Sequence, residues 1–477
     1  MTDPQSPPAS GIDRVDMVQW FTDTRDRLCL LPWLNIHTNT DGKIKLCCNI
    51  HLDHFVNILE KDLSITYFNF GYDDIDTIWN SKYMRSSRIK HHSNKGCTEC
   101  EGCYNLEKNT GHSPKIGQNQ LWNARLREDQ ELQTYMTDQM LGTVSELRAG
   151  MLPVSLELRL GNQCNLQCIS CWGMSSSLIH EERKEILKTN VLEEKGLSWL
   201  REKWTMDEEV VDNTQVKDWF ETDIFYSNFK KLAPNLRRLY TTGGEPTLIK
   251  SNYKMFQMLL DEGNTDCRIE FTSNMTTWNP EFYKRLEQFT NVEIQMSVDG
   301  VNEIGEYIRY PSDFSKVREN IFKAAELVST RPGWTVKCFT VLQALNCQYI
   351  GDIWDVLAEA CEKYNINIDW WPITLDHPNY LSLKSAPLDV RQQALRDLDR
   401  TRAHYRLGVE GNAFRVSKHT WQTLSDAMLN IPYEVSLNLA LCQAVDLNDS
   451  IRQSDGEILF ADILLEKQFY DSETKKI

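Results

Sequence analysis

The sequence lacks any apolar run near the ~18 residues that a membrane-spanning helix needs, so we expect no membrane partner. Its first residues, MTDPQSPPASGID, lack the basic and apolar stretches of a signal peptide, which indicates a cytoplasmic protein with a disordered tail over residues 1–20. Positive charge is also scarce, because 52 Lys and Arg stand against 68 Asp and Glu. The net charge of −16 disfavours a nucleic-acid partner, since such proteins usually carry a basic face.

Disulfide bonds are not expected in the cytoplasm, so the 14 cysteines of the chain need another explanation. Nine of them fall into two regions, residues 29–103 and 164–171, as metal ligands commonly do. The other five are scattered and are expected to be buried packing residues. These five are Cys267, Cys338, Cys347, Cys361 and Cys442.

From residue 155 onward, short β-type runs alternate with amphipathic helical patterns. The β-type runs, rich in β-branched and aromatic residues, cover residues 155–160, 236–242, 267–273, 292–298, 335–341 and 366–371. Apolar residues recur at helical spacing in residues 315–331 and 349–364. This alternation predicts an α/β fold with parallel strands, built as a curved sheet or partial barrel of six units. The working face of either form lies at the carboxyl ends of the strands.

The 477 residues exceed one average domain, and their composition divides the chain into five parts. In order, these are the tail 1–20, a cysteine-rich module 21–115, a helical connector 116–150, the α/β block 151–375 and a helical C-terminal region 376–477. A charged, helix-prone insertion interrupts the α/β block at about 174–222. We therefore expect one site in the α/β block and a second in the cysteine-rich module.

Three cysteines follow the first predicted strand. In LGNQCNLQCISC, Cys164, Cys168 and Cys171 stand at C-x3-C-x2-C spacing. Thiolates at such short loop spacings can converge on one iron–sulfur cluster, and three of them leave one iron of a [4Fe–4S] cluster without a protein ligand. A zinc loop that borrows a fourth ligand from elsewhere is the alternative.

Glycines and polar residues follow the next strands at the same predicted edge. The second strand ends in TTGGEP, where Gly243 and Gly244 let backbone carbonyls approach a ligand and Glu245 offers a carboxylate to a cation. The third and fourth strands run into FTSNMT and SVDGVNEIGEYIRYP. Their candidate ligand-binding residues are Ser273, Asn274, Ser297, Asp299 and Arg309. Turn formation is the alternative explanation for each of these short stretches.

The phrase CNLQCISC resembles the signature loop of the radical S-adenosylmethionine (radical SAM) superfamily. The resemblance implies a partial (β/α)6 barrel whose [4Fe–4S] cluster, on Cys164, Cys168 and Cys171, binds S-adenosylmethionine at its open iron. It also implies that one electron from the reduced cluster splits this cofactor and yields a 5′-deoxyadenosyl radical. The radical then abstracts a hydrogen atom from a substrate.

The same resemblance assigns roles around the cofactor. The GGEP stretch, which ends at Pro246, is similar to the family's motif for the methionine amino group. The polar residues that end the third and fourth strands are similar to family residues near the ribose. Arg309 is the expected bidentate partner of the methionine carboxylate.

The second cysteine region precedes the α/β block. Cys29 and Cys47 flank two β-type runs joined at Asp41-Gly42, and a hairpin there would bring the two thiols near each other. The later stretch GCTECEGC contains Cys97, Cys100 and Cys103 at successive C-x2-C spacings. Two hairpin thiolates and one C-x2-C pair make a closed four-ligand site, which suits zinc and a four-iron cluster equally well.

The spacing C-x12-G-x4-C, followed by C-x2-C-Y-x2-E-x3-G-x-S, resembles the twitch domain, a shortened SPASM-type module of radical SAM proteins. The resemblance implies an auxiliary [4Fe–4S] cluster that aids electron transfer or substrate placement. Its expected ligands are Cys29, Cys47, Cys100 and Cys103, with Cys97 as the alternate. Cys48 is expected to point away from Cys47, because side chains alternate along a strand.

Such modules often accompany peptide modification, so the resemblance implies a peptide substrate, as in ribosomal natural-product maturation, and a flavodoxin or ferredoxin as the reductant. Oxidation or epimerisation of a small sugar or amino-acid derivative is the alternative. A non-catalytic zinc-binding scaffold is the alternative of another class. An epimerase would need a hydrogen-donating cysteine, for which Cys338 and Cys442 are the candidates, and we assign no other catalytic residue.

Overall fold

The computed structural model describes residues 14–50, 55–59, 65–142, 147–212, 216, 218–405, 414–416 and 418–452. The chain divides into two compact units. The first comprises Met1–Leu160, Val216–Thr241 and Lys254–Cys267, and the second comprises Gly161–Gln215, Thr242–Tyr253 and Arg268–Ile477. None of the helices within the described ranges has the length and apolar character needed to cross a bilayer.

Five parallel strands form the sheet of the second unit. They are β7 (Arg268–Ser273), β8 (Val292–Ser297), β9 (Trp334–Leu342), β10 (Ile368–Thr374) and β11 (Phe414–Arg415). Each strand pairs in parallel with the next one. Side chains alternate between the faces of a strand, so the buried Ile294 and Met296 of β8 share one face. Glu293 and Gln295 share the other.

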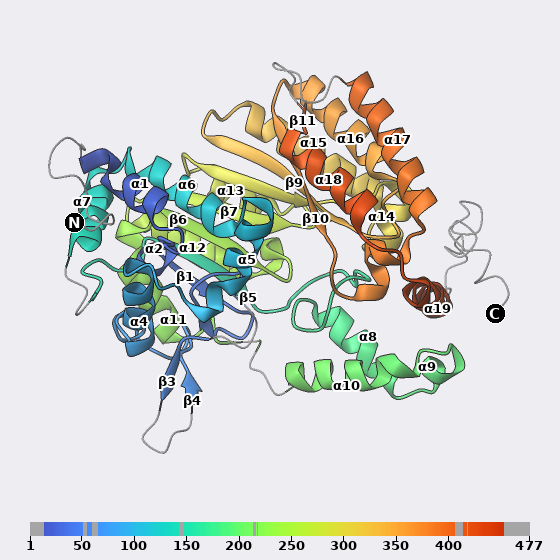
Figure 1. The fold of residues 1–477 in the computed structure, drawn as a ribbon, viewed down its shortest axis with the longest axis horizontal. Helices are drawn as coiled ribbons and strands as arrows, with labels where there is room; N and C mark the ends of the chain where they lie inside the picture. Colours follow the sequence, from blue (N-terminus) through green and yellow to red (C-terminus); the bar gives the residue numbers. More distant parts are fainter. Residues whose placement is uncertain are drawn as a thin grey trace. The chain divides into compact units, whose positions relative to one another are not determined.

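Two long helices lie side by side along this sheet, α15 (Phe314–Ser329) and α16 (Ile350–Tyr364) (Figure 1). Helix α15 begins where the side chain of Asp313 accepts hydrogen bonds from two backbone N–H groups of the first turn. It buries the apolar stripe expected from the sequence, namely Val317, Ile321, Ala325 and Val328. Helix α16 ends at Asn365, whose φ of +51° is the left-handed conformation typical of a helix C-terminus.

The other helices of the second unit fall into three groups. Helices α8 (Ser177–Leu187), α9 (Val191–Glu194) and α10 (Ser198–Asp212) contact one another and form the charged insertion (Figure 1). Helices α13 (Pro280–Leu286) and α14 (Asn302–Ile308) follow strands β7 and β8. The last helices are α17 (Leu388–His404), α18 (Lys418–Asn430) and α19 (Val435–Arg452). Short 3-10 turns η4 (Pro246–Leu248), η5 (Asn379–Leu381) and η6 (Leu383–Ser385) complete this unit.

The first unit contains a small mixed sheet. Its strands are β1 (Asn35–Thr38), β2 (Ile44–Lys45) and β5 (Ser155–Leu160), with β1 parallel to β5 and antiparallel to β2. A separate hairpin pairs β3 (Asn57–Leu59) with β4 (Ile65–Tyr67). Strand β6 (Arg238–Gly243) and helix α12 (Lys250–Asp261) each begin in one unit and end in the other.

Helices make up most of the regular secondary structure described in the first unit. They are α1 (Arg14–Thr24), α2 (Leu31–Leu34), α3 (Ile75–Trp79), α4 (Lys82–His92), α5 (Glu101–Thr110), α6 (Pro114–Leu126), α7 (Gln130–Leu141) and α11 (Asp223–Leu232), with 3-10 turns η1 (Thr98–Cys100) and η3 (Ala233–Asn235). An apolar core joins α1, α2, α6 and α7, and Cys29 belongs to it. The thiol of Cys29 therefore sits in apolar surroundings.

The α/β fold with a mostly parallel sheet is confirmed. All six β-type runs from residue 155 onward form strands, with ends within three residues of those expected. Helix α1 begins at Arg14, inside the segment expected as a tail, and the rest of that tail and residues 453–477 lie outside the described residues. The hairpin at Asp41-Gly42 is also present, and Gly42 has the φ of +81° that its turn needs.

The sequence did not predict helix α2, which separates Cys29 from the hairpin. This short helix forms because Leu31, Trp33 and Leu34 are all buried, which favours a compact turn over an extended strand. Cys29 therefore does not lie on a strand paired with the strand before Cys47. The packing of the module brings the two thiols near each other instead.

Candidate functional site

The loop between β5 and α8 carries the three cysteines of the C-x3-C-x2-C motif, and all three are half-buried. The backbone N–H of Cys171 donates to the carbonyl of Cys168 at 2.9 Å, which closes a turn between them. The N–H of Ile169 donates to the carbonyl of Ile308 at 3.0 Å, at the end of α14. This loop, residues 162–173, is called the cluster loop below, and its backbone bonds hold it at a fixed place in the second unit.

The thiols of the cluster loop influence one another electrostatically. Burial, together with the charge of Cys171, raises the pKa of Cys164 to about 11. Burial likewise raises the pKa of Cys171 to about 11, and Cys168 adds to this rise. The guanidinium of Arg309 opposes both shifts, so it lies close enough to act on the thiolates. Metal ions bind the thiolate form of cysteine. A bound cluster would therefore favour deprotonation of these thiols despite their raised pKa values.

Within the described parts of the chain, no group of three or more Cys, His, Asp or Glu side chains is placed to hold a metal ion. A four-iron cluster is a different case, because each thiolate binds a different iron and the ligands stand farther apart than around one ion. Three half-buried thiols on one loop therefore fit a four-iron cluster better than a single zinc ion.

Gly244 packs directly against the cluster loop. A Cβ atom at this position would lie 2.0 Å from the carbonyl oxygen of Gln163, which is far inside van der Waals contact. The neighbouring Gly243 has a φ of +130°, a conformation that side chains rarely adopt. The N–H of Glu245 donates to the same Gln163 carbonyl at 2.8 Å. The GGEP stretch and the cluster loop are thus in backbone contact.

Glu245 is a buried carboxylate at this contact, with an exposed fraction of 1%. Its Oε1 accepts a hydrogen bond from the hydroxyl of Thr247 at 2.7 Å, and its Oε2 accepts one from the N–H of Asn274 at 2.7 Å. Burial raises its pKa, and the hydrogen bonds oppose that rise. A positively charged ligand group beside Glu245 would be stabilising, because the cation would compensate the buried negative charge of the carboxylate. Pro246 follows and starts the turn η4.

Asp299 and Arg309 form an ion pair at the end of β8. Nη2 of Arg309 lies 2.7 Å from Oδ2 of Asp299, whose Oδ1 accepts from the N–H of Val341 at 2.6 Å. The buried Nε of Arg309 has no hydrogen-bond partner among the described residues. Arg309 was expected to face a ligand carboxylate, and the structure gives it the carboxylate of Asp299 as an internal partner.

The remaining predicted residues lie at the ends of β7 and β8. The side-chain amide of Asn274 donates to Oδ1 of Asn165 in the cluster loop at 2.9 Å. The hydroxyl of Ser273 is buried and accepts from the N–H of Met275 at 3.1 Å. Ser297 is the last residue of β8 and is partly exposed. Residues from the cluster loop, GGEP and the strand ends are therefore gathered at one edge of the second unit.

Residues 158–342 match the family model described as the radical SAM superfamily. The chain carries a radical SAM domain. This match spans the cluster loop, the GGEP stretch and strands β7 to β9. The fold and the expected [4Fe–4S] cluster with S-adenosylmethionine agree with this domain.

Several solved structures resemble the chain at a low level. One, "Native anSMEcpe with bound AdoMet", is 19% identical with a TM-score of 0.33, over 54% of this chain and 62% of that one. SuiB of Streptococcus suis is 10% identical with a TM-score of 0.32, over 77% of this chain and 71% of that one. The chain thus spans less than two thirds of the first of these proteins. No curated protein matches the chain.

The N-terminal cysteines lie together in the first unit, apart from the radical SAM cluster loop in sequence. Burial, together with the charges of Cys47 and Cys103, raises the pKa of Cys29 to about 12. The pKa of Cys47 is raised to about 12 by burial, with a contribution from Cys103. These three thiols are therefore neighbours. Cys48 is exposed, and its role as a spare thiol stays a prediction.

Cys97 and Cys100 form a second group that lies within electrostatic range of the first. A hydrogen bond between the two thiols lowers the pKa of Cys97 and raises that of Cys100, and Cys29 and Cys47 add to the rise at Cys100. The Sγ of Cys100 also lies 3.8 Å from Nε2 of His91 in α4. His91 was not predicted as a site residue, because nothing in the sequence distinguishes it from Lys90 and His92 beside it in the last turn of α4.

The candidate hydrogen donors are placed differently from each other. Cys338 is fully buried on β9, on the face opposite to Phe339, and burial raises its pKa to about 12. Cys442 is half-buried in α19. The positions of Cys338 and Cys442 are compatible with the packing role expected for both residues. Hydrogen donation by either thiol stays a prediction.

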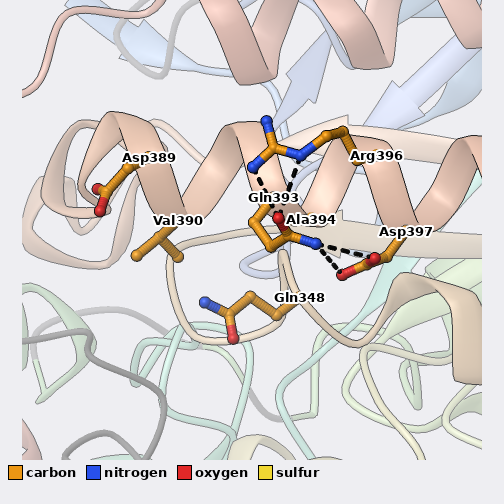
Figure 2. A pocket seen from close by; sticks show the side chains of 7 residues that line it. All are labelled: Gln348, Asp389, Val390, Gln393, Ala394, Arg396 and Asp397. Carbon is orange, nitrogen blue, oxygen red and sulfur yellow. Dashed lines mark hydrogen bonds between the residues drawn. The ribbon is translucent and has the colours of Figure 1, made fainter.

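A surface cavity of about 420 Å³ lies elsewhere in the second unit, on α17 (Figure 2). Its lining is Gln348, Asp389, Val390, Gln393, Ala394, Arg396 and Asp397. The side chain of Gln393 accepts from Arg396 and donates to Asp397, so these polar groups satisfy one another. None of the predicted site residues lines this cavity, and it adds nothing to the site.

The Gly244 contact gives a direct test of the site. In Gly244→Ala, the methyl group meets the Gln163 carbonyl, and the backbone must move at a cost of about 1–3 kcal/mol. We expect weaker binding of S-adenosylmethionine, measured by equilibrium dialysis on the iron-loaded protein. The control is Gly117→Ala in α6, where nothing lies within 4 Å of the added methyl and binding should be unchanged. Equal binding by both variants would contradict the close contact.

Proposed function

We propose that this protein is a radical SAM enzyme that cleaves S-adenosylmethionine reductively and abstracts a hydrogen atom from its substrate. The observation that carries the proposal is the backbone contact between Gly244 and the cluster loop. It supports a single site in which the GGEP stretch lies beside three thiols. These thiols would leave one iron of a bound cluster open for a ligand that GGEP also contacts. A zinc loop would not need this contact.

When bound, the [4Fe–4S] cluster on Cys164, Cys168 and Cys171 supplies one electron at low potential, which splits the sulfonium of the cofactor into methionine and a 5′-deoxyadenosyl radical. The residues of the chain hold and orient the cofactor. GGEP, with the buried carboxylate of Glu245, suits its cationic amino group.

Arg309 suits the cofactor carboxylate, because Asp299 holds one of its nitrogens and its buried Nε is without a partner among the described residues. The polar side chains of Ser273, Asn274 and Ser297 are proposed for the ribose. Fixing both charged ends of methionine would leave the sulfonium in one position relative to the cluster loop.

A peptide is the substrate that we propose. The support is the resemblance of the N-terminal module to twitch and SPASM modules, together with exposed apolar side chains on β10. Trp371 is 47% exposed and Ile373 is 50% exposed, and both lie on the same face of the strand. Such a face suits a substrate with apolar side chains. The alternative substrate is a small sugar or amino-acid derivative, and assays with both kinds of substrate would distinguish the two.

An auxiliary [4Fe–4S] cluster on Cys29, Cys47, Cys100 and Cys103 is part of the proposal. The support is the mutual electrostatic influence of these thiols, which places them near one another in the first unit. This cluster would accept an electron from the substrate radical or help to position the substrate. A cytoplasmic flavodoxin or ferredoxin is the proposed electron donor.

Cofactor cleavage is the first test. Anaerobic protein loaded with iron and sulfide is incubated with dithionite and S-adenosylmethionine, and 5′-deoxyadenosine is measured by mass spectrometry. We expect steady release from the wild type and none from the triple variant Cys164→Ala, Cys168→Ala and Cys171→Ala, because the open iron is lost. The control is Cys361→Ala, a buried thiol of α16 outside the site, which should retain release. Undiminished release from the triple variant would overturn the proposal.

The auxiliary cluster is tested by counting metal. We expect about eight irons and about eight sulfides per wild-type chain, as two four-iron clusters require. The variant Cys100→Ala with Cys103→Ala should retain about four of each. The exposed Cys48 offers a matched control, and Cys48→Ala should keep the full content. Zinc in place of iron at this module would contradict an auxiliary iron–sulfur cluster.

A further inference from the structure

A charged network outside the predicted site holds the cluster loop of the radical SAM domain. Arg183 of α8 donates from Nη2 to the carbonyl oxygen of Cys171 at 2.8 Å. Its Nη1 lies 3.3 Å from Oε1 of Glu208 in α10. The guanidinium therefore joins a proposed cluster ligand to a helix of the charged insertion.

The network continues from Glu208 to the surface. Nδ1 of His180 lies 2.5 Å from Oε2 of Glu208, and Nε2 of His180 lies 3.1 Å from Oδ1 of Asp212. Lys184 closes the series at 2.9 Å from Asp212. On α8, Arg183 and Lys184 follow His180 by three and four residues, and on α10 Asp212 follows Glu208 by four, so one face of α8 meets one face of α10.

The network is also packed tightly against the cluster loop. A Cβ atom on Gly173 would lie 2.3 Å from Oε2 of Glu208, so only glycine allows the carboxylate this close. The guanidinium carbon of Arg183 lies 5.0 Å from the centre of the Trp204 ring, which covers its face. The exposed fractions are 7% for Arg183 and 2% for Glu208.

Stability alone does not explain a buried ion pair at this place. The cost of removing two charges from water is often as large as their attraction, and apolar residues of the same size would serve as well. Fixed charges beside an iron–sulfur cluster have a different effect, because hydrogen bonds and net charge around the cluster set its reduction potential. A cation favours the reduced state, which carries one more negative charge, and an anion disfavours it.

We propose that Arg183 and Glu208 set the reduction potential of the radical SAM cluster, with Arg183 as a positioning residue that acts through Cys171. Arg183 raises the potential and Glu208 lowers it. His180 and Asp212 hold the carboxylate of Glu208 against Gly173. The inference rests on the proposed function, since it needs a cluster on the cluster loop.

The test is a redox titration of the iron-loaded, full-length protein. Dithionite supplies one electron per cluster in the presence of mediators, and electron paramagnetic resonance (EPR) follows the signal that S-adenosylmethionine perturbs. We expect a more negative midpoint potential for Arg183→Gln, which removes the positive charge and keeps the carboxylate of Glu208, and a more positive one for Glu208→Gln. The double variant should return close to the wild type, because both charges are gone.

Two further variants separate charge from structure. Arg183→Lys keeps the positive charge and should stay near the wild-type potential, whereas a purely structural role would shift it as far as Arg183→Gln does. Lys184→Gln removes an exposed cation at the outer end of the network and should leave the potential unchanged. Thermal unfolding and iron content are measured on every variant to show that the fold and the cluster persist.

Opposite shifts for the two single variants support the proposal. Unchanged potentials, or shifts of the same sign, would overturn it while leaving the radical SAM function intact. A wild-type protein without iron on this loop would instead refute the proposed function on which the inference depends.

Discussion

The absence of a side chain at Gly244 is the constraint on which the site depends. It lets the GGEP backbone meet the carbonyl of Gln163 within the cluster loop. The next residue, Glu245, then donates to the same carbonyl and turns its carboxylate toward the backbone of Asn274. The backbone contact of Gly244 and the buried carboxylate of Glu245 in this way hold together three segments that lie far apart in the sequence. A cofactor bound among them would find its partners already in position.

Much of this arrangement could be predicted from the sequence. The β-type runs gave the strands because alternation and β-branched residues are local properties. The carboxyl ends of parallel strands share an edge, so residues that follow different strands were expected together. The three cysteines and GGEP belong to short motifs, and the spacing of their residues predicted a cluster and a cofactor site. For the cluster loop and the strand ends, local pattern and topology were therefore sufficient.

Other parts depend on packing that no local pattern reveals. Helix α2 forms because its apolar residues are buried by distant helices, so the run after Cys29 was expected as a strand. Arg183 and Glu208 lie in an insertion that the sequence predicted only to be charged and helical. Their ion pair forms because helices α8 and α10 pack together, which no local pattern indicates. His91 beside Cys100 is a similar case. Asp299 as the partner of Arg309 was also missed, because both had been assigned to a ligand.

The central claim is that three thiols leave one iron open for S-adenosylmethionine. The most direct measurement is the EPR spectrum of the reduced, iron-loaded protein before and after S-adenosylmethionine is added. We predict that the cofactor changes the spectrum of one cluster, because it becomes a ligand of the open iron. The same addition should leave the spectrum of the Cys164→Ala, Cys168→Ala and Cys171→Ala protein unaltered. A wild-type spectrum that does not respond to the cofactor would contradict the claim.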